Sequence, residues 1–196
     1  MMPRYECVRL VDFNDRQYQR LRARFTSFRK RKGIGPSSRD LFSKDAERTL
    51  RRWLEGNIHL TMLRIIRYRE RIGVGTIEKY RELDGVGLDG SRLLLFEIKT
   101  TRSKEAVQAG LEQLATAREI LGHGFPAIRT CLLVVDTDDA PNSPVATFLS
   151  RSPVVRFIGS LDELSDDPRP HVMLFSVADI ETLSQVPVHL EWRDAA

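Results

Sequence analysis

The sequence contains few cysteines and no long apolar run. Its two cysteines, Cys7 and Cys131, are too few for a disulfide framework, and neither has a Cys-x-x-Cys spacing or a nearby histidine partner. We therefore expect no zinc site. A membrane-spanning helix needs about 20 consecutive apolar residues, and no stretch approaches that length. Because the basic, polar first residues also lack the apolar core of a signal peptide, we expect a cytoplasmic protein that does not enter a membrane.

Several ligand-binding motifs are also missing. The four histidines show no H-E-x-x-H or other metal-ligand spacing, and Gly85-Val-Gly87 precedes an Asp-Gly turn instead of the helix that a dinucleotide-binding loop requires. With 196 residues, of which 41% are hydrophobic, the chain is long enough to bury a core and short enough to be one domain. We expect a basic N-terminal segment, residues 1–39, packed on or next to a core domain of residues 40–196.

The charges are distributed unevenly along the chain. Residues 1–39 hold 11 Lys and Arg against 3 acids, a net charge of +8, whereas residues 136–196 hold 4 Arg against 11 acids, a net charge of −7. A concentrated basic segment is typical of a surface that binds a phosphate backbone. The residues expected to contact a nucleic acid are Arg22, Arg24, Arg29, Lys30, Arg31 and Lys32. Of the aromatic residues among them, Tyr18, Phe25 and Phe28 are either base-stacking groups or core residues, and the core interpretation is favoured.

One hairpin-like segment carries the charged groups that matter most for chemistry. Glu97 and Lys99 lie in a run of apolar residues, and because side chains alternate across a strand, the two share one face. The Asp89-Gly90 dipeptide is a strong signal for a hairpin turn, which folds the preceding run back and brings Asp84 towards Glu97. The sequence therefore predicts two carboxylates beside one ammonium group.

This trio suits metal-dependent hydrolysis of a phosphodiester. Mg²⁺ prefers oxygen ligands and keeps several waters, so Asp84 and Glu97 suffice as protein carboxylates. The ion would polarise the scissile phosphate and generate hydroxide from a bound water. Lys99 would hold or help deprotonate that water, since its proton affinity falls when it is desolvated or near a metal. The purely structural alternative is an exposed ion pair between Glu97 and Lys99, worth about 0–1 kcal/mol.

The spacing of Asp84, Glu97, Ile98 and Lys99 resembles the signature of the PD-(D/E)XK nuclease superfamily: an Asp, a spacer, Glu or Asp, any residue, and Lys. The resemblance implies a restriction-endonuclease-like α/β sandwich, in which a central mixed sheet is flanked by helices. It also implies that Asp84, Glu97 and the backbone carbonyl of Ile98 bind Mg²⁺, with Mn²⁺ able to substitute, and that Lys99 orients the nucleophilic water. The Pro that often precedes the Asp in this superfamily is Leu83 here.

A helix is predicted before the hairpin, from Ser43 as N-cap to Gly56, after a loop or hinge at 33–38. Its apolar stripe consists of Ala46, Leu50, Trp53 and Leu54. Glu47 lies next to this stripe, and the resemblance implies that a Glu on this helix completes the metal site. The alternative is a first-turn Glu stabilised by the helix dipole, worth about 0.3–1 kcal/mol.

A second helix is predicted after the hairpin, over residues 104–121, followed by a buried strand at 131–136. This order fits an α/β sandwich in which the Glu97 strand is central. The resemblance further implies that a Gln on this helix approaches the site. Gln113, fourteen residues after Lys99, has the expected spacing, and Gln108 is the alternative.

The remaining segments give weaker signals. Residues 60–67 suit a helix and 72–82 a strand, so the region between the first helix and the hairpin stays ambiguous. Towards the C-terminus we expect a short helix at 145–149 and strands at 154–158 and 171–177. Three acids after the buried strand are interpreted as turn formers instead of metal ligands: Asp136, Asp138 and Asp139.

Together these patterns predict a Mg²⁺-dependent nuclease that hydrolyses phosphodiester bonds, with DNA as the expected substrate. One alternative is a catalytically silent module on the same fold that binds a nucleic acid or a protein. A further alternative is an RNA-directed nuclease, because charge recognises phosphate and does not distinguish RNA from DNA. Since cutting two strands commonly needs two sites, the resemblance also allows a homodimer.

Overall fold

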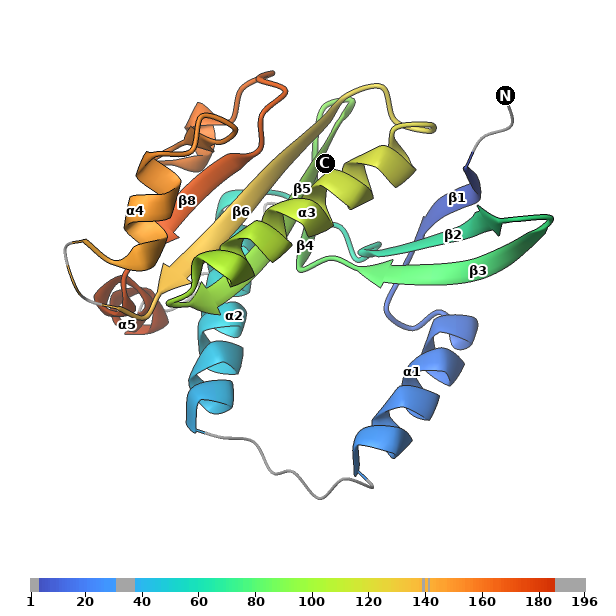
Figure 1. Cartoon of the computed structure of the whole chain (residues 1–196), viewed down its shortest axis with the longest axis horizontal. Helices are drawn as coiled ribbons and strands as arrows, with labels where there is room; N and C mark the ends of the chain where they lie inside the picture. The colour runs from blue at the N-terminus through green and yellow to red at the C-terminus, as the bar shows by residue number, and fades with distance from the viewer. Residues whose placement is uncertain (1–3, 31–37, 139, 141, 186–196) are drawn as a thin grey trace, which may run out of the picture.

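A computed structural model describes residues 4–30, 38–138, 140 and 142–185 of the chain, without the side chains of 25–30 and 38–40. The chain alternates strands and helices (Figure 1). In order, the elements are β1 (Tyr5–Val11), α1 (Arg16–Lys30), α2 (Ser38–Asn57), β2 (Ile65–Ile72), β3 (Gly75–Glu82), β4 (Gly85–Asp89), β5 (Arg92–Thr101), α3 (Lys104–Leu121), β6 (Ile128–Asp136), α4 (Pro144–Ser150), β7 (Arg156–Phe157), a 3₁₀ turn (Leu161–Glu163), β8 (His171–Phe175) and α5 (Val177–Gln185).

The larger of two sheets has five strands in the order β4-β5-β6-β8-β7. β4 and β5 are antiparallel, and the other neighbouring pairs are parallel, so this is a mixed sheet. α3 connects β5 to the parallel strand β6 and, with α4, covers one face of the sheet, while α2 and α5 pack on the other (Figure 1). The protein is therefore an α/β protein, as predicted, and the strand that carries Glu97 is hydrogen-bonded on both sides.

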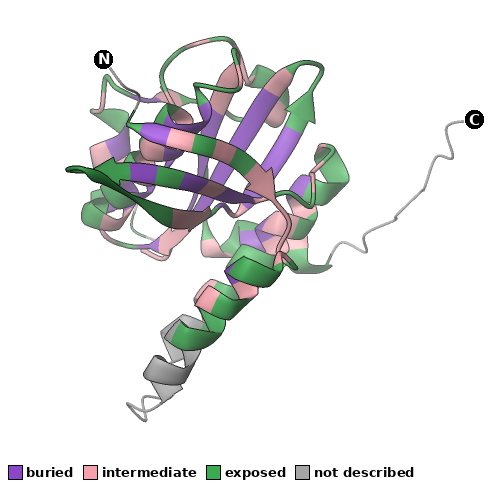
Figure 2. Cartoon of the chain, turned by 90° about the vertical axis from the view of Figure 1, so that its right-hand side faces the viewer, coloured by how far each residue is buried: buried purple, intermediate pink, exposed green. Residues whose placement is uncertain are grey.

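The core is formed by the middle of this sheet and the helices on its two faces. Buried residues are concentrated in its strands (Figure 2). Six consecutive β6 residues, Cys131 to Asp136, are buried, which confirms the prediction of a strand covered on both faces. Each fully buried Leu or Val contributes about 1.5–3 kcal/mol by removal of apolar area from water.

The smaller sheet is antiparallel, in the order β1-β2-β3, and was not expected as a separate unit. β2 and β3 form a hairpin whose turn contains Gly73 at φ 60°, a left-handed conformation that favours glycine. The helix considered for residues 60–67 is wrong, because Ile65, Ile66 and Tyr68 are buried in β2. The predicted strand at 72–82 corresponds to β3, but the hairpin turn that precedes it was missed.

Other boundaries also differ from prediction. α2 begins at Ser38, five residues before the predicted N-cap Ser43, since no Pro or Gly interrupts the intervening sequence. The helix at 145–149 is confirmed as α4, whereas β7 keeps only two of the residues predicted at 154–158. β1 and α5 were not predicted. The predicted hinge at 33–38 lies outside the described residues, apart from Ser38.

None of the helices in the described ranges combines the length and apolar character needed to cross a membrane.

Candidate active site

The β4–β5 hairpin brings Asp84 and Glu97 together. Asp84 lies on a bend directly before β4, and pairing of Gly85 with Phe96 places this bend beside the Glu97 end of β5. The Asp84 carboxylate accepts a hydrogen bond from the backbone N–H of Ile98, with an Oδ2–N distance of 2.7 Å. The predicted turn at Asp89-Gly90 is present, with Gly90 at φ 59°. The side chain of Asp84 is thus fixed to the backbone of the strand that carries the other charges.

Glu97 and Lys99 form an ion pair on β5, with 2.5 Å between Lys99 Nζ and Glu97 Oε1. Their side chains are 9% and 23% exposed, so the alternative of a fully exposed surface pair is wrong. An ion pair that is this buried brings little net stability, because both charges lose hydration. Stabilisation of the fold therefore does not explain the ion pair of Glu97 and Lys99.

The carboxyl groups of this site hold their protons unusually tightly. The pKa of Glu97 is raised to about 7, first because burial desolvates the carboxylate and second because Asp84 repels its charge. The pKa of Asp84 is also raised, mainly by burial, although the hydrogen bond from Ile98 and the charge of Lys99 oppose this. Among the described residues, Lys99 is the cation in hydrogen-bond contact with Glu97, whereas Arg64 and Arg81 lower the pKa values of Asp84 and Glu97 through their charge alone.

Glu47 lies at the margin of this site. Much of its side chain faces solvent, yet the pKa of its carboxyl is raised, first by partial desolvation and then by the charges of Asp84 and Glu82. Lys99 is near enough to oppose this shift. Because α2 begins at Ser38, Glu47 is in the third turn of the helix. The helix dipole acts mainly within the first turn, so the interpretation of Glu47 as a first-turn Glu stabilised by the dipole does not apply.

The Lys99 side chain packs against Gly110 of α3. A Cβ atom at Gly110 would lie 2.8 Å from Leu132 Cδ1 and 3.1 and 3.3 Å from Cγ and Cε of Lys99. The missing side chain thus provides the space that the lysine occupies. Sequence reasoning missed this residue, although a glycine in the middle of a predicted helix is a signal for close packing.

Gln113 is one turn beyond Gly110 on the same helix, and its side chain is partly buried. Its Oε1 atom is buried and has no hydrogen-bond partner among the described residues, which is unusual for a polar atom in a folded protein. The alternative, Gln108, is exposed and donates a hydrogen bond to Glu112 on the helix surface, at 3.3 Å. Gln113 is therefore the glutamine with unused hydrogen-bonding capacity.

Two arginines fix the backbone around Asp84. Arg51 of α2 donates to the Asp84 carbonyl at 3.1 Å, and Arg64 donates to the Leu83 carbonyl at 3.3 Å. Arg64 also forms an ion pair with Glu82 at 3.1 Å, and the Tyr18 hydroxyl donates to the same carboxylate at 2.7 Å. The sequence shows that these arginines are basic, but only the tertiary structure shows that they hold the site.

The basic N-terminal segment is described only in part. Arg22 and Arg24 are exposed on α1, and the Arg22 guanidinium lies 4.4 Å from the ring centre of Phe13. Tyr18 is 7% exposed and packs inwards, which confirms the core interpretation for this aromatic residue. The remaining expected contact residues, and two of the aromatic ones, have no described side chain: Phe25, Phe28, Arg29, Lys30, Arg31 and Lys32.

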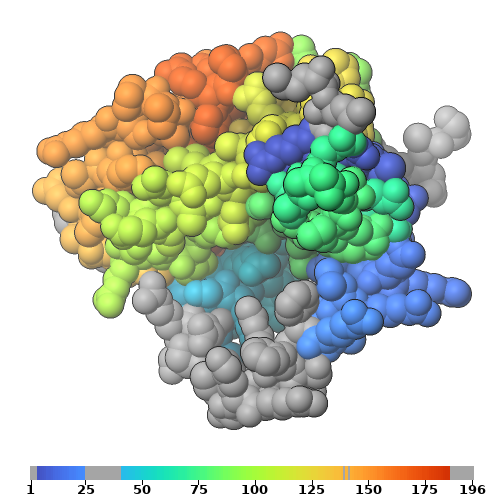
Figure 3. Space-filling view, turned by 45° about the vertical axis from the view of Figure 1, so that its right-hand side comes forward, coloured from blue at the N-terminus to red at the C-terminus, as the bar shows by residue number. Residues whose placement is uncertain are grey.

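The surface is recessed at α2. In the space-filling view, α2 (cyan) lies in a depression between α3 (yellow-green), the small sheet (green) and α1 (blue) (Figure 3). α2 is the helix that carries Glu47 and Arg51.

The carboxylate pair differs from a preformed multi-ligand metal centre. Within the described ranges, no group of three or more His, Cys, Asp or Glu side chains is arranged to hold a metal. Two carboxylates and a backbone carbonyl nevertheless match the ligand demand of Mg²⁺, which takes oxygen ligands and retains waters. Asp84 and Glu97 offer oxygen donors of the kind that Mg²⁺ takes, without the Cys or His ligands that are typical of a zinc site.

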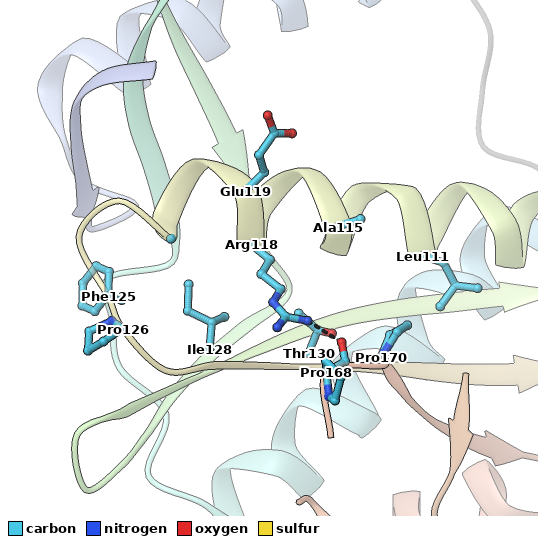
Figure 4. A pocket seen from close by; sticks show the side chains of 11 residues that line it. Leu111, Ala115, Arg118, Glu119, Phe125, Pro126, Ile128, Thr130, Pro168 and Pro170 are labelled. Carbon is cyan, nitrogen blue, oxygen red and sulfur yellow. Dashed lines mark hydrogen bonds between the residues drawn. The ribbon is translucent and has the colours of Figure 1, made fainter. Parts of the chain in front are cut away.

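Two other features lie apart from these residues. Asp136 accepts hydrogen bonds from the Ser143 hydroxyl and from the backbone N–H of Asp138, which confirms its interpretation as a turn former. Asp139 lies outside the described residues. A cavity of about 510 Å³ is formed between the second half of α3, the start of β6 and the loop that contains Pro168, whose carbonyl accepts a hydrogen bond from Arg118 (Figure 4). None of the predicted site residues lines this cavity.

Comparison of the chain with protein-family models, curated proteins and solved structures gave no match.

Proposed function

We propose that this protein is a Mg²⁺-dependent nuclease with a restriction-endonuclease-like fold, and that DNA is its substrate. One observation carries the proposal: the partly buried Asp84 and the buried Glu97 repel each other, and Lys99 is the ammonium group hydrogen-bonded to Glu97. Burying two mutually repelling acids costs free energy unless a cation compensates them. A divalent cation at this position supplies that compensation, and such arrangements are typical of functional sites.

In the proposed site, Asp84, Glu97 and the Ile98 carbonyl hold Mg²⁺, with Mn²⁺ able to substitute, and Glu47 approaches from α2. A bound ion would supply positive charge to polarise the phosphate and to acidify a nearby water. Lys99 has the role of holding that water, because its Nζ is fixed by Glu97 and its stem is confined by Gly110. The Asp84 side chain keeps its orientation through the N–H of Ile98. The amide of Gln113 is available for a further hydrogen bond to substrate or water.

The basic character of α1 supports a nucleic acid as the substrate. Exposed arginines on this helix, including Arg22 and Arg24, present positive charge, and neutralising phosphates releases counterions. The same charge would serve a non-catalytic module or an RNA-directed enzyme, so cleavage is the property that separates these possibilities. Homodimerisation stays a prediction.

Cleavage of labelled DNA and RNA in Mg²⁺, Mn²⁺ or EDTA tests the proposal, with Lys99→Ala as the inactive variant. Lys44→Ala is a matched control, since Lys44 is exposed on α2. We expect metal-dependent cleavage by wild type and Lys44→Ala, and loss of cleavage in a folded Lys99→Ala protein. Equal cleavage by Lys99→Ala would contradict the proposed role. Salt-sensitive binding without any cleavage by wild type would instead favour the binding module.

A further inference from the structure

A groove of about 810 Å³ lies between the start of α3 and α4. In Figure 1, the first turn of α3 lies beside α4 at the carboxyl end of β6, and the two helices are in contact. β5 leads directly from Lys99 through Thr101 to Arg102, which lines the groove. At about 3.3 Å per residue, Arg102 is about 10 Å along the chain from Lys99. The chain therefore connects the groove to the proposed active site through three residues.

The charged residues that line the groove are mainly cations. Arg102, Lys104 and Arg151 contribute three positive charges, and Glu105 contributes one negative charge. The Glu105 carboxylate already accepts a hydrogen bond from the Ser103 hydroxyl at 2.8 Å. Neither Arg102 nor Arg151 forms an ion pair with a carboxylate in the part of the chain that the structure describes. Two exposed guanidinium groups are thus available to an anionic ligand.

The groove also has an apolar side. Phe148 packs partly against the core, and with Pro144 and Pro153 it lines the same space as the arginines. Positive charge beside an aromatic ring suits an unpaired nucleic acid strand, which offers both phosphates and exposed base faces. A duplex keeps its base faces stacked inside and presents mainly its backbone.

From this combination we propose that the groove binds a single-stranded segment of the substrate, next to the bond that is cleaved. Arg102 and Arg151 contact the phosphates, and Phe148 contacts a base or sugar. This inference rests on the proposed function, because the continuity of β5 with the groove connects it to the Lys99 site. It adds that the substrate has an unpaired end, flap or gap.

Fluorescence anisotropy in EDTA tests the inference without cleavage, with labelled single-stranded DNA and RNA of about 15 nucleotides and a duplex of the same sequence as probes. The test variant is Arg102→Gln/Arg151→Gln. The control is Arg9→Gln/Arg69→Gln, because both of these arginines are exposed and lie on the small sheet. We expect the groove variant to bind single strands about tenfold more weakly, with a salt dependence reduced by about 0.7 per lost phosphate contact. The control variant should retain its affinity.

The possible failures are distinguishable when cleavage is measured in parallel. Unchanged single-strand affinity of the groove variant would overturn the groove assignment, while cleavage by wild type would leave the proposed function intact. An equal loss of duplex affinity would overturn the single-strand preference. If wild type neither binds nor cleaves any probe, the proposed function fails, and the inference fails with it. A preference for the DNA or the RNA strand identifies which nucleic acid the groove holds.

Discussion

Glu70 and Glu97 are the two buried glutamates of this protein's described core, and their surroundings are opposite. Glu70, on β2, accepts hydrogen bonds from Arg4 at 2.9 Å and from Lys79 at 2.6 Å, and these partners lower its pKa. Glu97, on β5, has one hydrogen-bonded cation and an acidic neighbour, and its pKa is raised to about 7. Their residues are similarly buried, at 9% and 7% exposure. Similar surface exposure therefore does not make the two acids alike: desolvation dominates the pKa shift of Glu97, whereas two hydrogen-bonded cations dominate that of Glu70.

The largest expected difference between the two glutamates is in activity. We predict that Glu97→Gln lowers the cleavage rate at least about 100-fold, because a neutral amide removes a metal ligand and frees Lys99. Glu70→Gln should retain cleavage within about twofold and lose about 0.5–1 kcal/mol of stability. Single-turnover cleavage and urea unfolding measure the two effects. If both variants lose activity alike, Glu97 has no special role.

The pH dependence of stability should have opposite signs at the two residues. Glu97 has a folded pKa of about 7, above its unfolded value near 4.5, so its contribution is fully present below pH 4.5 and is lost as the pH rises through 7. At pH 8 in metal-free buffer, the free energy of unfolding of Glu97→Gln should therefore exceed that of wild type by roughly 1–3 kcal/mol. The variant should accordingly unfold at a higher urea concentration. Glu70 has a lowered pKa, so its contribution is present above its unfolded pKa and is lost as the pH falls through the folded value. Urea unfolding of both variants from pH 4 to pH 8 measures how the free energy of unfolding changes with pH. The same pH dependence in Glu97→Gln and wild type would contradict the raised pKa of Glu97.

Addition of Mg²⁺ should stabilise one region and leave the other unchanged. At a concentration tenfold above its Kd, a bound ion raises the free energy of unfolding by about 1.4 kcal/mol. We expect this increase at pH 8 in wild type and in Glu70→Gln, and its absence in Glu97→Gln. At pH 6 the increase should be smaller, because protons compete with the metal for Glu97. Thermal unfolding with Mg²⁺ and with EDTA measures it, and an equal Mg²⁺ effect in all three proteins would place the ion elsewhere.

The smallest effect is expected from a single methyl group. Gly110→Ala should lower cleavage severalfold, because the added Cβ meets the Lys99 stem and Leu132. Stability should change little, because the gain in helix propensity, about 0.5–1 kcal/mol, offsets the closer contacts. Gly56→Ala is the control, since no atom lies within 4 Å of a Cβ at that position. Gly110→Ala should show a reduced cleavage rate at saturating substrate. An unchanged rate would mean that Lys99 accommodates the added methyl group.

Local patterns predicted the β4–β5 hairpin and the helices α2, α3 and α4, while α1, α5 and the contacts between distant segments were missed. The strand alternation around Glu97 and the Asp89-Gly90 turn are properties of adjacent residues, and they sufficed to place Asp84 beside β5. The small sheet depends on pairing of β1 with β2, such as Tyr5 with Glu70, across more than sixty residues. No local periodicity reports such a contact. The same reason explains why Arg51 and Arg64 were recognised only as basic residues.

The position of Asp84 between β3 and β4 has a mechanical consequence. These two strands belong to different sheets, so Asp84 is at a covalent joint between them. Arg51 of α2 and Arg64, which precedes β2, donate hydrogen bonds to the backbone of this joint. Tyr18 of α1 donates a hydrogen bond to Glu82, at the end of β3. A displacement of the small sheet or of α1 relative to the large sheet is therefore transmitted to one of the two carboxylates. The distance between Asp84 and Glu97 thus depends on the position of the small sheet and α1 relative to the large sheet.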